Sequence, residues 1–129
     1  MRALGLDYGL ARTGVAVSDA TGTLARPVGV VERAAAEAGL SRLAALVAEH
    51  GAEVVVVGLP LTLRGERGEQ VRATESFVES LRTRIGVPIE TYDERFTTAL
   101  ASQTPSDAPE DALAAAHLLQ GWLDRRGSR

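Results

Sequence analysis

Four consecutive valines, Val54 to Val57, constrain the fold of this chain more than any other feature of its sequence. β-branched side chains favour strands, and an apolar run without polar alternation is typical of a strand that is buried on both faces. Gly58 and Pro60 follow directly and end the strand. The run therefore predicts a central strand in a sheet whose two faces are both covered.

Three shorter strands are predicted before the valine run. Each is a short apolar or alternating segment, and turns that contain glycine and aspartate separate them. They cover residues 2–7, 13–18 and 27–32. Because the turns are too short for a crossover connection, these strands should form an antiparallel meander.

Helical periodicity surrounds the valine run in the second half of the chain. Apolar residues at helical spacing predict one helix that Ser41 caps and a second over about residues 68–85 that Gly86 stops. The remaining segments are a strand over residues 87–92, an ambiguous stretch over 97–101, a polar loop over 103–109, and a last helix that Asp107 caps and that runs to about Asp124.

This order of elements predicts an α/β fold with a mixed five-stranded sheet and flanking helices. Strands that are separated by helices pair in parallel, whereas the first three pair antiparallel. We expect the first strand at the centre, with the fifth strand and the last helix beside it. The length of 129 residues is usual for one domain, so residues 1–129 are expected to form a single one.

The composition excludes several classes of protein. The chain has no cysteine, which excludes disulfides, thiolate nucleophiles and cysteine-based zinc sites. No stretch approaches the roughly 18 apolar residues of a membrane span, so we expect a cytoplasmic protein without a membrane partner. The net charge of −3 argues against a protein that coats nucleic acid non-specifically. All 14 cationic residues are arginines, whose guanidinium groups suit phosphate.

Carboxylates stand at three unusual places in this pattern. Asp7 ends an apolar strand, where a buried acid is costly unless it is paired or binds metal. Asp93 and Glu94 end the fifth strand, and only one of them can join a site on a given face because strand residues alternate. Asp111 opens the last helix and shares a face with apolar residues, so it should point at the sheet. Each acid also has an ordinary explanation, as a turn cap, an arginine partner or a favourable charge at a helix N-terminus.

Taken together, the three acids predict a metal site. Carboxylates that lie close together repel by roughly 4 kcal/mol per pair at an effective dielectric of about 20, and a hard cation relieves that repulsion. Oxygen ligands without cysteine suit Mg²⁺ or Mn²⁺. Two such ions about 3.5–4 Å apart clamp the attacking and leaving oxygens of a phosphodiester. The cluster therefore favours a metal-dependent phosphodiesterase.

A series of motifs then resembles the YqgF family, also called the RuvX type, whose members are described as pre-16S ribosomal RNA nucleases or Holliday junction resolvases. The motifs cover almost the whole chain in order. They are LGLDYG at residues 4–9, GVAVSD at 14–19, VGLPL at 57–61, YDERFTT at 92–98 and DALAAA at 111–116. The segments VGLPL and YDERFTT, in register with the first motif, are the most specific part of the resemblance.

The resemblance implies an RNase H-like fold and a nuclease that leaves 5′-phosphate and 3′-hydroxyl ends. It implies that Asp7, Glu94 and Asp111 are the catalytic and metal-binding acids, which selects Glu94 over Asp93. It also places the loop over residues 58–68 near substrate. The candidates to hold substrate phosphates are Arg12, Arg64, Arg67 and Arg95. One departure concerns residues 99–110, a segment that is shorter than is usual in the family and contains no cation.

The carboxylates predict an Mg²⁺- or Mn²⁺-dependent nuclease, and the resemblance implies that its substrate is the 5′ end of pre-16S ribosomal RNA. A resolvase of Holliday junctions or other branched DNA is the alternative, and symmetric cleavage of a junction would need a homodimer, not a monomer. A non-catalytic module that binds ribosomal RNA during ribosome assembly is another. An ATP-binding domain of the actin and hexokinase type would need two such lobes, and 129 residues supply one.

Overall fold

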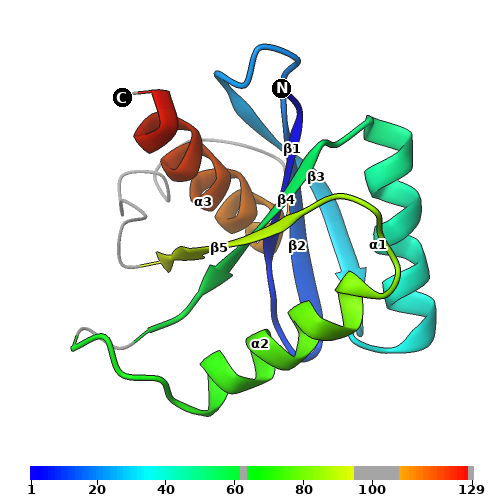
Figure 1. The fold of residues 1–129 in the computed structure, drawn as a ribbon, viewed down its shortest axis with the longest axis vertical. Coiled ribbons are helices and arrows are strands. Elements are labelled where there is room, and N and C mark those ends of the chain that lie inside the picture. The colour runs from blue at the N-terminus through cyan, green and yellow to red at the C-terminus, as the bar shows by residue number, and fades with distance from the viewer. Residues whose placement is uncertain (62–63, 95–107, 128–129) are drawn as a thin grey trace.

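The structure is a computed structural model that describes residues 1–61, 64–94 and 108–127 (Figure 1). Its strands and helices follow one another along the chain in the predicted order. They are β1 (Ala3–Asp7), β2 (Arg12–Ser18), β3 (Ala25–Glu32), α1 (Glu37–His50), β4 (Val54–Leu59), α2 (Glu69–Arg82), β5 (Ile89–Asp93) and α3 (Glu110–Gly127).

The five strands form one mixed sheet in the order β3-β2-β1-β4-β5. β1, β2 and β3 pair antiparallel, and β1, β4 and β5 pair in parallel. The predicted sheet and the central place of β1 are confirmed. The prediction that the fifth strand lies beside the first is wrong, because β4 pairs with β1 on one side and with β5 on the other. Val56 shows this, since it is in register with Gly5 and with Glu90.

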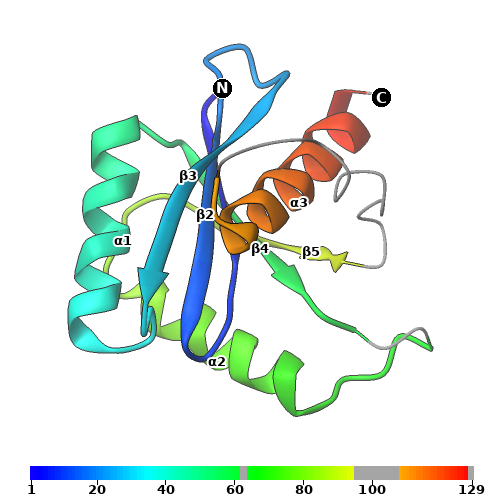
Figure 2. The same ribbon diagram turned by 180° about the vertical axis from the view of Figure 1, so that it is seen from behind.

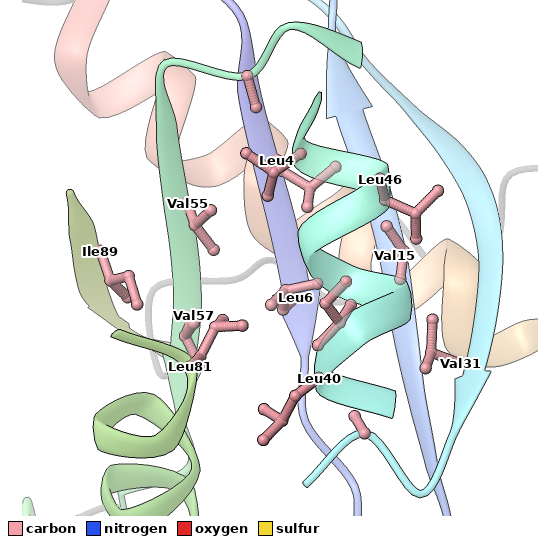
Figure 3. Close-up of a cluster of buried hydrophobic side chains, with 14 of the residues drawn as sticks. Leu4, Leu6, Val15, Val31, Leu40, Leu46, Val55, Val57, Leu81 and Ile89 are labelled. Atoms are coloured by element: carbon pink, nitrogen blue, oxygen red, sulfur yellow. The ribbon is translucent and has the colours of Figure 1, made fainter. Parts of the chain in front are cut away.

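Helices cover both faces of the sheet, with α1 and α2 on one face and α3 on the other (Figures 1 and 2). Val55 and Val57 point into the core beneath α1 and α2 (Figure 3), whereas Val54 and Val56 belong to the core beneath α3. The valine run therefore lies in a strand that is buried on both faces, as predicted. The alternation also assigns every other strand residue to one of the two faces.

Two helix ends differ from the prediction. α1 begins at Glu37 and not near Ser41, since its N-cap residue is Ala36, which makes no side-chain capping hydrogen bond. The backbone N–H of Leu40 already donates to the Ala36 carbonyl at 2.9 Å. α2 ends at Arg82, before the predicted stop, because the N–H of Thr83 turns back to the Ser80 carbonyl at 3.3 Å.

The last helix begins at Glu110 and runs to Gly127, a little beyond its predicted end at Asp124. The ambiguous stretch over residues 97–101, most of the predicted polar loop and the predicted cap Asp107 lie outside the described residues. Within the described ranges, no helix combines the length and the apolar character that crossing a membrane requires.

Candidate active site

The carboxyl ends of β1, β4 and β5 meet at one edge of the sheet because these strands run parallel. Asp7 is the last residue of β1, and Glu94 follows the last residue of β5. β2 runs the opposite way and begins at this edge with Arg12. We call this end of the sheet the acidic edge.

Strand alternation turns Asp7 and Glu94 toward the same face. Tyr92 packs in the core beneath α3, and Glu94 lies two residues further along. A side-chain carbon on Gly5 would lie 2.8 Å from Leu119 of α3, so Asp7, two residues on, also faces α3. The geometry therefore brings Glu94, and not Asp93, to the side of the sheet on which Asp7 lies.

Asp7 and Glu94 share a hydrogen bond between their half-buried carboxyl groups. Burial raises the pKa of Glu94 to about 8, helped by its hydrogen bond to Asp7 and by the Asp7 charge. Burial also raises the pKa of Asp7, although the hydrogen bond from Glu94 opposes that rise. The two carboxyl groups thus hold one proton between them, with Glu94 as the donor.

Gly58 makes this hydrogen bond possible across the intervening strand β4. A side-chain carbon at position 58 would lie 2.6 Å from Oε1 of Glu94, closer than real contacts allow. A residue with a side chain would therefore push Glu94 away from Asp7. Sequence reasoning missed this role, although a glycine that follows four valines in a strand does signal a close approach.

Asp111 reaches the same edge because the first turn of α3 packs directly on β2. A side-chain carbon on Gly14, the register partner of Asp7, would lie 1.8 Å from the backbone oxygen of Asp111. The charge of Asp111 acts on Asp7 and raises its pKa further. The structure therefore places all three predicted acids at the acidic edge, with Asp7 hydrogen-bonded to Glu94 and within electrostatic range of Asp111.

Arg12 contacts one of these acids. Its Nε lies 3.2 Å from Oδ2 of Asp111, and the exposed fractions of the two side chains are 66% and 35%. Arg12 was predicted to hold a substrate phosphate, and it does lie at the acidic edge. Sequence reasoning did not foresee its contact with Asp111.

The donor set at the acidic edge fits a hard cation, since every side-chain donor of the three acids is a carboxylate oxygen. Two half-buried carboxyl groups share a proton at a place where a divalent ion could replace it. In the arrangement shown, however, no three Asp, Glu or His side chains of residues 1–61, 64–94 and 108–127 are placed to enclose a metal ion. The carboxylate of Asp111 is engaged by Arg12 instead.

The other predicted phosphate ligands lie in or beyond the segment after β4. Arg64 and Arg67 are both exposed and follow the carboxyl end of β4. Arg67 forms an ion pair with Glu75 of α2. Arg95 lies outside the described residues.

Comparison with known proteins gives a consistent result at the level of sequence. The family model described as "RuvX: Holliday junction resolvase" matches residues 1–125. A relative from Chloroflexus aggregans, named "Putative pre-16S rRNA nuclease", is 42% identical over 95% of this chain and 93% of its own length. A relative of the same name from an Anaeromyxobacter species is 43% identical over 98% of each chain.

Solved structures show the same architecture at much lower identity. RuvC from Thermus thermophilus in complex with a Holliday junction substrate has a TM-score of 0.62 and 19% identity, covering 99% of this chain and 97% of that one. The Fowlpox virus resolvase with Holliday junction DNA has a TM-score of 0.59 and 11% identity, covering 98% and 99%. These similarities establish the expected RNase H-like fold.

Proposed function

Because this chain belongs to the RuvX family, also called YqgF, we propose that it is a nuclease that hydrolyses phosphodiester bonds with the help of a divalent cation. The carboxyl pair of Asp7 and Glu94 carries the proposal. Holding two acids against each other in a half-buried place costs stability, and such groups gather where function requires them. Asp111 beside them completes a set of oxygen donors.

Asp7, Glu94 and Asp111 would hold Mg²⁺ or Mn²⁺ through their carboxylate oxygens. When bound, a divalent cation supplies a water of lowered pKa as nucleophile and a Lewis acid for the phosphate oxygens. Glu94 gives up the proton it shares with Asp7 when the site is loaded. That proton can leave to solvent, since neither carboxyl group is fully buried.

The chain carries a net charge of −3, so its overall charge does not attract nucleic acid. Binding of the substrate phosphates therefore depends on a few arginines near the site. Arg12 lies at the acidic edge, and the segment with Arg64 and Arg67 leaves β4 at that edge. Arg95 directly follows Glu94 in the sequence. We assign these four residues to the substrate backbone, where arginine forks bind phosphate oxygens.

The favoured substrate is a ribosomal RNA precursor, cut near the 5′ end of the 16S sequence. Relatives named for that activity are about 40% identical to this chain, whereas the two resolvases solved with Holliday junction DNA are 19% and 11% identical. Branched DNA is the second candidate, supported by the description of the family model. A single domain over residues 1–129, acting in the cytoplasm as a monomer or homodimer, completes the proposal.

One experiment separates these possibilities. A single preparation is incubated with a pre-16S ribosomal RNA fragment and with a four-way DNA junction, each in Mg²⁺, in Mn²⁺ and in EDTA. We expect cleavage of the RNA that requires the metal and is lost in the Asp7→Asn variant. Cleavage of the junction alone would reassign the substrate. Activity that survives exhaustive chelation, or RNA binding without any cleavage, would contradict the proposal.

A further inference from the structure

We propose that Arg12 has two partners in turn. It holds Asp111 while the acids lack a cation, and it binds a phosphate of the nucleic acid once a cation engages Asp111. The inference rests on the proposed function, because it assigns Asp111 to the metal site. It makes Arg12 a positioning residue that links the binding of metal to the binding of substrate.

Arg12 has a fixed backbone and a side chain that is free to change rotamer. Its backbone is fixed in β2, in register with Glu32 of β3. Its side chain is 66% exposed, so solvent surrounds most of it and other rotamers are open. The Nε–Oδ2 contact of 3.2 Å is therefore a contact that the guanidinium can leave without disturbing the sheet.

The charges at the acidic edge explain why Arg12 should leave. Arg12 and a divalent cation compete for the same Asp111 carboxylate, and two positive groups on one carboxylate repel each other. An ion pair this exposed shifts an equilibrium by no more than roughly fivefold, so a bound dication can displace it. Asp7 and Glu94 make no ion pair with another described residue, so among the described arginines Arg12 is the one that has to leave an acid of the site.

When the cation displaces Arg12 from Asp111, the Arg12 guanidinium is left beside the acids without an ion-pair partner. A guanidinium fork binds phosphate oxygens through two parallel hydrogen bonds, which suits it to the next partner. Because coupling between two ligands is reciprocal, substrate that captures Arg12 should also strengthen metal binding by freeing Asp111. The pair formed by Arg42 and Glu49 on α1 is similarly exposed, with fractions of 54% and 56%, and provides a matched control away from the acidic edge.

The first test measures Mn²⁺ binding by isothermal titration calorimetry without nucleic acid. Arg12→Gln should bind Mn²⁺ about twofold to fivefold more tightly than the wild type, because the competitor is gone. Arg42→Gln should bind like the wild type. Unchanged or weaker binding by Arg12→Gln overturns the inference. Failure of the wild type to bind Mn²⁺, or binding that Asp7→Asn leaves unaltered, overturns the proposed function as well.

The second test distinguishes the ion pair from a general effect of charge. Binding of a single-stranded RNA and of a four-way DNA junction is measured in EDTA, where no cleavage occurs. Asp111→Asn should bind about threefold more tightly than the wild type because it frees Arg12. That gain should vanish when Arg12→Gln is added. An equal gain with and without Arg12 overturns the inference, whereas a wild type that binds neither nucleic acid contradicts the proposed function.

Discussion

The two ends of the sheet shift the pKa of an aspartate in opposite directions. Asp7 ends β1 at the acidic edge, where burial and the Asp111 charge raise its pKa. Asp19 follows β2 at the far edge, where the hydroxyl of Thr21 and the backbone N–H groups of Thr23 and Leu24 donate to its carboxylate at 2.7–3.2 Å. These hydrogen bonds lower the pKa of Asp19 to about 2.

The surroundings of Asp19 and Asp7 alone distinguish a structural acid from a candidate catalytic one. The far edge satisfies its polar groups, as where the Ser18 hydroxyl accepts the Ala3 N–H at 2.8 Å. The acidic edge instead places Asp7 against a second acid and near a third. An acid that neighbouring donors stabilise holds a turn, whereas acids that destabilise one another are ready to bind a cation.

The largest expected effect comes from exchanging the two aspartates for asparagine. Asp7→Asn should lower turnover by a factor of about 10² or more, because it removes a proposed metal ligand. It should leave the melting temperature in EDTA unchanged or slightly higher, since the half-buried charge that Asp111 repels is lost. Asp19→Asn should do the reverse, with normal turnover and a lower melting temperature. Near-normal turnover by a folded Asp7→Asn protein would remove the distinction between the edges.

A smaller loss of turnover should follow from filling the space over Gly58. Gly58→Ala places a carbon against the Glu94 carboxyl group and should reduce cleavage by roughly tenfold to a hundredfold. Gly29→Ala in β3 is the control, because nothing lies within 4 Å of the added carbon. Steady-state cleavage of both variants tests the prediction. Equal activities would show that the Asp7–Glu94 contact has no part in the reaction.

The pH dependence of stability should also differ between the edges in metal-free protein. From about pH 4.5 to about pH 8 the folded state keeps the Glu94 proton that the unfolded chain has lost, so the free energy of unfolding falls as pH rises. Glu94→Gln should remove that decline and melt several degrees higher at pH 8, but alike near pH 4.5. Asp19 acts oppositely, since its stabilisation is present above pH 3.8 and is lost as pH falls through about 2.

Thermal melts in EDTA across this pH range provide the measurement. A wild type and a Glu94→Gln variant that decline in parallel between pH 4.5 and pH 8 would show that Asp7 and Glu94 do not share a proton. Asp19→Asn should keep the decline in that window, because the far-edge carboxylate is already ionised there. The Asp19 variant therefore serves as the control for the acidic edge.

The smallest expected effect concerns the affinity for nucleic acid. Replacing Arg64 and Arg67 together by Ala should weaken binding at moderate salt and reduce the log–log salt slope by about one to two units, if each contacts a phosphate. Turnover at saturating substrate should change much less. The matched control replaces Arg42, which is exposed on α1. An unaltered slope on both RNA and branched DNA would leave Arg12 and Arg95 as the phosphate ligands.

The strands of the sheet and the three acids could be predicted because each is marked by the pattern of residues next to it in the sequence. The valine run is incompatible with an exposed strand, and its alternation sorts Val54 and Val55 to opposite faces. Asp7 stood out because an acid ending an apolar strand needs a partner. Asp111 stood out because the apolar residues on its helical face had to meet the sheet, and its carbonyl does lie over Gly14.

The remaining features depend on which segments become neighbours in space. The roles of Gly58 and of the Arg12–Asp111 pair follow from β4 lying between β1 and β5 and from α3 packing on β2, and no local pattern contains that information. The prediction that Ser41 caps the first helix was wrong, although a serine hydroxyl is suited to that position. The helix instead begins earlier, where the backbone around Ala36 already makes the first turn.

The contact between Gly14 and the start of α3 has a consequence for the time at which the protein can act. A growing chain releases its N-terminal elements first, so β1 and β2 are present long before α3 is made. Asp111 reaches Asp7 only when α3 has docked on β2. An unfinished chain therefore has the first acid but not the last. Under the proposed assignment of Asp111 to the metal site, that site therefore stays incomplete until α3 has been made and has docked on β2.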